Sequence, residues 1–141
     1  MTRAVAIFSG TNYSTEVLCG PHTVTADEPP ARGGQDAGPS PSDLLSVALA
    51  SCTAITLRMY AEHKLWPLEG IQVEVELHRA ADKSTSMDRV LRLRGPLSDE
   101  QRARLADISE RTPVTLTLKS GAQIHTTIEQ SATSPSPNTF V

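Results

Sequence analysis

The stretch Gly38–Glu69 decides the fold; it reads GPSPSDLLSVALASCTAITLRMYAEHKLWPLE. It opens with a helix start signal, since Ser40 suits the N-cap position and Pro41 the first helical position. Asp43, three residues past the cap, completes a Ser-x-x-Asp variant of the capping box. The run that follows is apolar or small on almost every face, which is typical of a helix surrounded by protein. The pattern predicts a buried helix over 41–63, roughly 30 Å long, with sheets packed around it.

Length and composition limit the classes to which this protein can belong. A chain of 141 residues is one domain, and we expect it to cover 1–129 with a disordered tail over 130–141. The net charge of −3 and the aromatic content of 4% argue against a nucleic-acid partner, and the charge also argues against an anionic membrane surface. The N-terminus has no apolar region long enough for a signal peptide, and the central run contains Ser and Thr and ends in Arg58. We therefore expect a cytoplasmic protein with no membrane span and with free thiols.

The remaining chain predicts an α+β fold with antiparallel sheets. Alternation and turn residues predict strands at 3–8, 13–18 and 22–26 before a Pro- and Gly-rich loop over 27–39. After the long helix the pattern predicts two strands, a second helix capped by Ser98 and Gln101, and a last hairpin; their ranges are 71–78, 87–94, 98–111, and 114–118 with 123–128. The pair of strands before the second helix would place three arginines opposite two glutamates; these are Arg89, Arg92, Arg94, Glu74 and Glu76.

Two cysteines are the residues that could carry chemistry. Cys52 lies in the long helix on a small, mostly apolar ledge, and it is either an inert packing residue or a reactive thiol. A reactive thiol needs a nearby positive group, for which Arg32 and Arg111 are the candidates. Cys19, beside a Gly-Pro turn, is either an incidental surface thiol or a resolving cysteine for Cys52. The four histidines show no metal-ligand spacing, so we expect neither a metal site nor a cofactor.

Several motifs around the long helix resemble those of the OsmC/Ohr family. The matching segments are 26–29, 33–34, 38–45, 48–54, 56–61 and 66–68, and the OsmC-like branch is the most similar. The resemblance implies an OsmC-like fold, in which antiparallel sheets wrap around a long central helix in an intertwined homodimer with thiol sites at the subunit interface. In the peroxidase members a helix cysteine attacks a hydroperoxide and a second cysteine then forms a disulfide with it. Cys52 matches the attacking position.

Three positions depart from the family's peroxidase pattern. The resolving cysteine precedes the proline that ends the second helix, and here that residue is Thr112. The carboxylate ten residues before the attacking cysteine is replaced by Ser42. The loop after the first strand, where the family has an arginine, reads Ser-Gly-Thr-Asn-Tyr around Asn12. The activating and recycling partners that the family supplies are thus absent from these positions.

Two hypotheses of different class follow. In the first, the protein is a thiol-dependent hydroperoxide reductase of oxidative-stress defence, with Cys52 attacking, Arg32 activating it, and Cys19 or an external thiol resolving it. In the second, it is a non-peroxidatic OsmC-like homodimer that binds a small apolar or thiol-containing ligand. The first hypothesis needs a positive charge within about 4–6 Å of the sulfur, whereas the second needs only a lined pocket.

Overall fold

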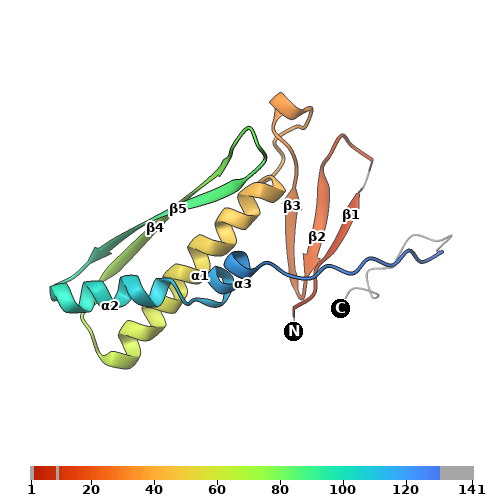
Figure 1. Ribbon diagram of the computed structural model, residues 1–141. Helices are drawn as coiled ribbons and strands as arrows, with labels where there is room; N and C mark the ends of the chain where they lie inside the picture. Colours follow the sequence, from red (N-terminus) through yellow and green to blue (C-terminus); the bar gives the residue numbers. More distant parts are fainter. Residues whose placement is uncertain (1, 9, 131–141) are drawn as a thin grey trace. The chain divides into compact units, whose positions relative to one another are not determined.

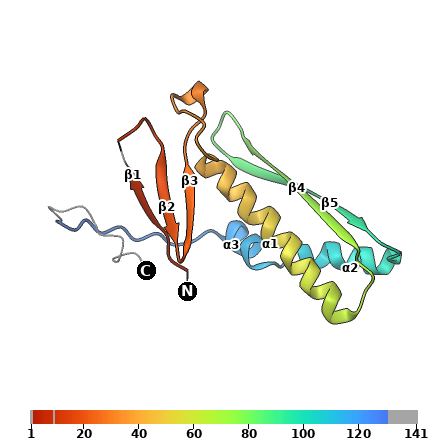
Figure 2. The same cartoon turned by 180° about the vertical axis from the view of Figure 1, so that it is seen from behind.

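The computed structural model describes residues 2–8 and 10–130. The chain forms two compact units: the first holds the described residues up to Leu44 and those from His125 onward, and the second spans 45–124. Figures 1 and 2 show the elements of each unit from two sides. The α+β composition with antiparallel strands confirms the predicted fold class, whereas the single domain over 1–129 stays a prediction. The predicted tail over 130–141 lies, apart from its first residue, outside the described residues.

The first unit contains a three-stranded antiparallel meander. Its strands are β1 (Val5–Phe8), β2 (Thr15–Cys19) and β3 (His22–Ala26), in the order β1-β2-β3. This arrangement confirms the meander predicted from the alternating pattern and the two turns.

The loop after β3 is organised by one buried carboxylate. Asp27, 2% exposed, accepts hydrogen bonds from the backbone N–H groups of Glu28 (2.7 Å), Gln35 (3.1 Å) and Ala37 (3.1 Å). The bond from Ala37 is the largest cause that lowers the pKa of Asp27 below its ordinary value. The loop folds so tightly that a Cβ on Gly34 would lie 1.8 Å from the carbonyl oxygen of Glu28. Only glycine fits there, so the Gly-rich loop has a steric origin.

Helix α1 (Pro41–Lys64) begins as its sequence predicts. The backbone N–H of Ser40 donates to Asp43 Oδ2 (3.0 Å), and the backbone N–H of Asp43 donates to Ser40 Oγ (3.1 Å). The shorter aspartate therefore closes the reciprocal capping box.

Only one stripe of α1 is buried within the described chain. The buried residues recur every four positions and are Leu49, Thr53, Leu57 and Ala61. Val47, Ile55 and Met59 remain 53%, 56% and 65% exposed. By length and composition α1 could also cross a membrane, a test that the core helix of a soluble protein passes as well. The chain itself covers one face of this helix, and the prediction that protein surrounds the whole helix stays a prediction.

In the second unit a long hairpin lies along α1 (Figures 1 and 2). Strands β4 (Gly70–Arg79) and β5 (Thr85–Arg94) pair antiparallel along their full length. Inward and outward residues alternate, as predicted. Arg92 donates to Glu74 across the pair at 2.8 Å, as expected, but Arg89 points to the inner face instead. The expected pairing of Arg89 with a strand glutamate is wrong, because Arg89 and Arg92 have opposite parity in the strand.

Helix α2 (Asp99–Ser109) confirms the second helix and its capping box, in which Ser98 and Gln101 bond reciprocally. Leu105 of this helix is fully buried.

The predicted last hairpin over 114–118 and 123–128 is wrong. The chain forms helix α3 (Pro113–Ser120), followed by residues 121–130 with no regular structure. The segment Val-Thr-Leu-Thr-Leu alternates like a strand, but it lies between a helix start and a helix stop. Thr112 caps the start, Pro113 occupies the first position, and Gly121 ends the helix with φ of 73°. The local termination signals therefore prevail over the β-propensity of the segment.

Candidate functional site

Cys52 lies about three turns into α1 with a half-buried, free thiol. Its Sγ is 3.9 Å from the Oγ1 of Thr56, one turn further along. Cys52 belongs to the second unit, whereas Cys19, exposed at the end of β2 opposite His22, belongs to the first. The roles of Cys52 as attacking thiol and of Cys19 as resolving thiol stay predictions.

Both arginines that are candidates for activating Cys52 are exposed. Arg32 is the last residue of the short 3-10 helix η1 (Pro30–Arg32) and is exposed in the first unit. Arg111 is also exposed, and its Nη2 pairs with Asp107 Oδ2 at 2.7 Å. The activating role of Arg32, like that of Arg111, stays a prediction.

The three positions that depart from the family's pattern have structural contacts of their own. Thr112, fully buried, accepts the backbone N–H of Thr115 as the N-cap of α3, and the two hydroxyls lie 2.6 Å apart. Asn12 Nδ2 donates to the carbonyl oxygen of Gly33 at 3.2 Å, which links two loops of the first unit. Ser42 lies half-buried in the first turn of α1. A threonine hydroxyl can cap a helix but cannot form a disulfide, so position 112 supplies no resolving thiol.

Arg89 is a largely buried cation beside the cavity, and no sequence motif marks it as a site residue. Its side chain is 11% exposed, and Nη1 donates to the hydroxyls of Thr53 and Thr115, each at 3.0 Å. Its Nη2 lies 3.3 Å from Glu110 Oε1. Since Thr53 directly follows Cys52, the guanidinium is held against the helical turn that carries the thiol. The signal was present in the sequence, because Arg89 shares its parity with Met87, Leu91 and Leu93.

Glu110 joins two cations at this place. Lys119 Nζ donates to its second oxygen, and this bond is the largest cause that lowers the pKa of Glu110 below its ordinary value, with Arg89 adding to it. Glu110 is therefore ionised at neutral pH. Two cations and one carboxylate leave this cluster with a net charge of +1.

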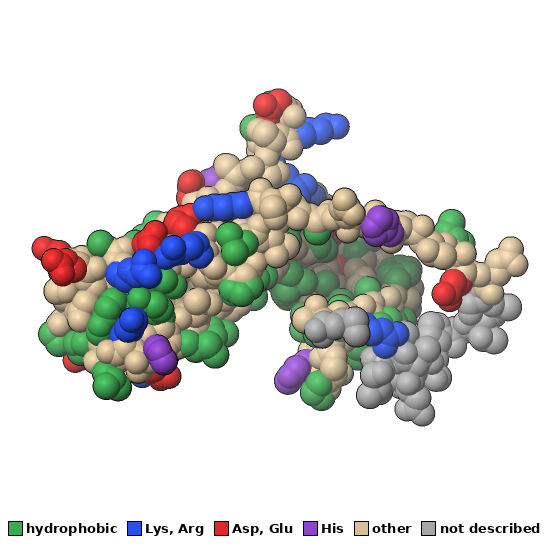
Figure 3. All heavy atoms as spheres, turned by 60° about the horizontal axis from the view of Figure 1, so that its bottom comes forward, with side chains coloured by type: hydrophobic (Ala, Val, Ile, Leu, Met, Phe, Trp, Pro, Cys, Tyr) green, Lys and Arg blue, Asp and Glu red, His purple; other side chains and the backbone are tan. Residues whose placement is uncertain are grey.

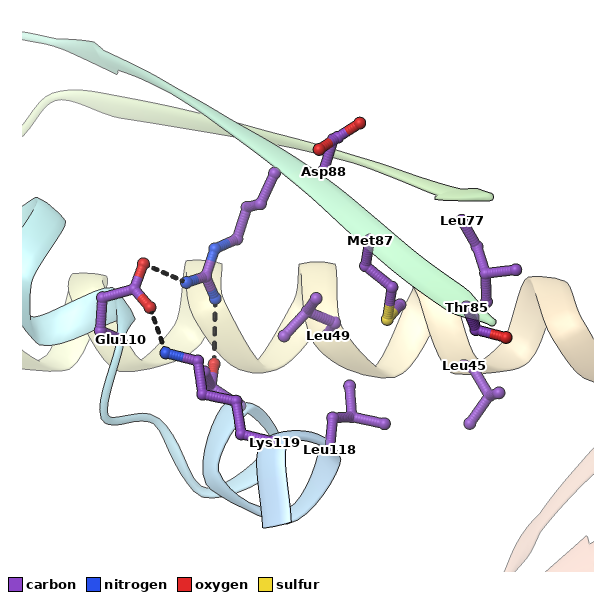
Figure 4. A pocket seen from close by; sticks show the side chains of 11 residues that line it. Leu45, Leu49, Leu77, Thr85, Met87, Asp88, Glu110, Leu118 and Lys119 are labelled. Atoms are coloured by element: carbon purple, nitrogen blue, oxygen red, sulfur yellow. Dashed lines mark hydrogen bonds and ion pairs between the residues drawn. The ribbon is translucent and has the colours of Figure 1, made fainter. Parts of the chain in front are cut away.

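A cavity of about 500 Å³ opens beside this cluster, wholly within the second unit. Figure 4 shows the side chains from α1, the β4–β5 hairpin and α3 that surround it. Most of its wall is aliphatic, contributed by Leu45, Leu49, Leu77, Met87 and Leu118. Arg89, Glu110, Thr115 and Lys119 form its polar end. An apolar wall with a few polar groups at one end is typical of small-molecule sites.

The described part of the chain contains no cluster of side chains suited to bind a metal ion. No group of three or more His, Cys, Asp or Glu side chains there lies close enough to hold a metal ion.

Comparison with known proteins identifies the family. The sequence model described as "OsmC-like protein" matches residues 33–127, and the chain belongs to this family. No curated protein matches the chain at a significant level.

Solved structures agree in fold. An OsmC-like protein from Mycoplasma pneumoniae is 19% identical, with a TM-score of 0.73 over 84% of this chain and 87% of that chain. An organic hydroperoxide resistance protein OsmC from Legionella pneumophila is 24% identical, with a TM-score of 0.63 over 84% and 89%. An organic hydroperoxide resistance protein from Elizabethkingia anophelis is 17% identical, with a TM-score of 0.61 over 83% and 87%. At these identities the likeness concerns the fold.

Proposed function

We propose that this protein is a cysteine-based organic hydroperoxide reductase of oxidative-stress defence, in which Cys52 attacks and an external thiol completes the cycle. The Cys52 thiolate attacks the distal oxygen of the hydroperoxide, the O–O bond breaks, and the alcohol leaves with the proton of the thiol. The sulfenic acid then condenses with one external thiol, which releases water and leaves a mixed disulfide. A second external thiol restores Cys52 and carries the electrons away as a disulfide.

The observation that carries this proposal is the half-buried free thiol of Cys52 on the long helix of an OsmC-like chain. Two structural relatives are named organic hydroperoxide resistance proteins, which supports the same chemistry. Thr112 is enclosed in a hydroxyl cluster and offers no thiol, so the resolving thiol comes from elsewhere. We favour an external thiol, with Cys19 as the internal alternative.

Steady-state turnover tests this proposal. Purified protein is supplied with an organic hydroperoxide and a dithiol reductant, and hydroperoxide consumption is followed over time. We expect Cys52→Ser to abolish turnover and Cys19→Ser to retain it. Turnover that survives in Cys52→Ser would refute the assignment of the attacking thiol, and turnover lost in Cys19→Ser would move the resolving role to Cys19.

We also propose that the working form is a homodimer in the cytoplasm, with sheets around central helices. Two exposed apolar features support a second copy. One is the α1 face formed by Val47, Ile55 and Met59. The other is the extended segment after α3, where Ile124 and Ile128 are 86% and 91% exposed. The space-filling view shows hydrophobic side chains at the surface (Figure 3). Burial of such groups by a partner is favourable because it removes apolar area from water.

Light scattering after size exclusion measures this state. We expect twice the monomer mass for the wild type. Met59→Glu places a charge in the proposed interface and should shift the mass toward the monomer, whereas Arg92→Glu on the outer face of the hairpin should not. A monomeric wild type would refute the homodimer.

The cavity supports a second candidate function, that of a non-peroxidatic dimer that binds a small ligand. A cavity of about 500 Å³ with an aliphatic wall needs no thiol chemistry to hold an apolar molecule. The two functions separate in the turnover assay, since a pure binding protein consumes no hydroperoxide at any reductant concentration.

A further inference from the structure

Arg89 is the unusual feature of the second unit's interior. Every other inward residue of β5 after Ser86 is apolar, yet this arginine has the same parity and a side chain only 11% exposed. Burial of a guanidinium costs free energy unless charged or hydrogen-bonded partners compensate it. Two of its partners are neutral threonine hydroxyls, and the third, Glu110, is shared with Lys119. The cavity end therefore keeps an excess positive charge.

Apart from Glu110, no acidic residue among the described lining residues turns its side chain into the cavity. Asp88 is the other acidic residue that borders it, but Figure 4 shows this side chain on the opposite side of β5 from Met87. Asp88 Oδ2 lies 3.1 Å from His78 Nε2 on the outer face of the hairpin. The chamber thus combines a cationic end with a wall of leucine and methionine.

We propose that this cavity binds a small aliphatic carboxylic acid, with its carboxylate on Arg89 and Lys119 and its chain along the leucine wall. A carboxylate matches the planar donor face of a guanidinium, and its charge complements the cluster. The aliphatic chain replaces water against Leu45, Leu49 and Leu118. The site does not depend on the thiol chemistry proposed for Cys52, because none of its lining residues is a cysteine.

A comparison of the affinities for an acid and for its uncharged analogue tests the proposal. Octanoate and octan-1-ol have equal chains, and their binding to Cys52→Ser protein is measured by calorimetry, so that no thiol reaction interferes. A charge-assisted hydrogen bond in a part-buried site corresponds to about tenfold or more in affinity. We therefore expect octanoate to bind about tenfold more tightly than octan-1-ol. Equal affinities, or no octanoate binding, would overturn the proposal.

Variants locate the site. Arg89→Met in the same background should weaken octanoate about tenfold and leave octan-1-ol unchanged. Arg92→Met, on the outer face of the same strand, is the matched control and should change neither. If Arg89→Met does not fold, Lys119→Met takes its place, with a smaller, severalfold loss expected for octanoate alone. Octanoate affinity that stays constant in the folded site variant would overturn the assignment.

A second copy of the chain is the competing occupant. If a partner subunit fills the cavity, octanoate binds only as the dimer dissociates, and its apparent affinity falls as the protein concentration rises. That result would overturn the ligand site. An affinity independent of protein concentration supports it. Neither result depends on whether Cys52 reduces hydroperoxides.

Discussion

Replacement of Arg89 by methionine removes the inward-facing charge of β5 while keeping a side chain of similar length. The substitution breaks two hydrogen bonds of 3.0 Å, to Thr53 and Thr115, and one ion pair of 3.3 Å, to Glu110. Arg92→Met is the matched control, because Arg92 is 52% exposed and its contact is an outer ion pair with Glu74.

The contacts of Arg89 determine how much free energy of unfolding the substitution should cost. Each hydrogen bond to a threonine hydroxyl contributes about 0.5–1.5 kcal/mol. The hydroxyls are not left without partners, since Thr53 still donates to Leu49 O (2.7 Å) and Thr115 to Ser109 O (3.0 Å). Glu110 is 54% exposed and keeps Lys119, so its pair with Arg89 contributes about 0–1 kcal/mol. The relieved desolvation of a buried cation offsets part of the sum. We expect a net loss of about 1–2 kcal/mol in the free energy of unfolding.

Urea denaturation at one fixed protein concentration measures this change, because dissociation would otherwise alter the midpoint. With an m-value of about 2 kcal/mol/M, the midpoint of Arg89→Met should fall by about 0.5–1 M. Arg92→Met should stay within about 0.5 kcal/mol of the wild type. Equal shifts for the two variants, or a higher midpoint for Arg89→Met, would refute the view that the inner cluster stabilises the fold.

Three further predictions concern the core and the first unit. Leu105→Ala removes a fully buried side chain of α2 and should cost about 2–5 kcal/mol in urea denaturation, and a loss below about 1 kcal/mol would contradict that burial. Gly34→Ala places a Cβ 1.8 Å from Glu28 O and should destabilise the loop by on the order of 1–3 kcal/mol, seen as a lower melting temperature, whereas an unchanged Tm would contradict the close approach. The lowered pKa of Asp27 means that its ionised form stabilises the folded state above the ordinary pKa of about 3.9. The stability difference between wild type and Asp27→Asn should therefore be full near neutral pH and shrink as the pH falls through the folded-state pKa, and a difference that is constant with pH would contradict this role.

The sequence predicts those parts of the fold whose causes are local. Both capping boxes, at Ser40 and at Ser98, form as their short-range patterns indicate, because each needs only residues three positions apart. The alternation of β4 likewise predicts its inner face. The prediction for the segment after Thr112 fails because two local signals conflict there. The alternation favours a strand, whereas the flanking residues favour the start and end of a helix, and the segment's own sequence does not show which signal prevails.

The candidate site was less predictable than the fold. The position of Cys52 on the long helix follows from the sequence, but its surroundings depend on which residues meet from distant segments. Arg89 is 36 positions from Thr53 and 26 from Thr115, so no motif spacing joins them. Its parity in β5 indicates an inward side chain, yet only the packed unit shows the hydroxyls and the carboxylate that receive it. Residues that a second copy of the chain would add to the surroundings of Cys52 follow from no motif in the sequence.

Product mapping after a single exposure to hydroperoxide shows whether Cys52 is the thiol that attacks. Reduced protein receives one equivalent of an organic hydroperoxide, a sulfenic-acid trap is added, and peptides are mapped by mass. If Cys52 attacks, the adduct of the sulfenic-acid trap appears on the Cys52 peptide, also in Cys19→Ser protein, with one equivalent of alcohol released. An unmodified Cys52 with intact hydroperoxide, or an adduct confined to Cys19, would contradict it.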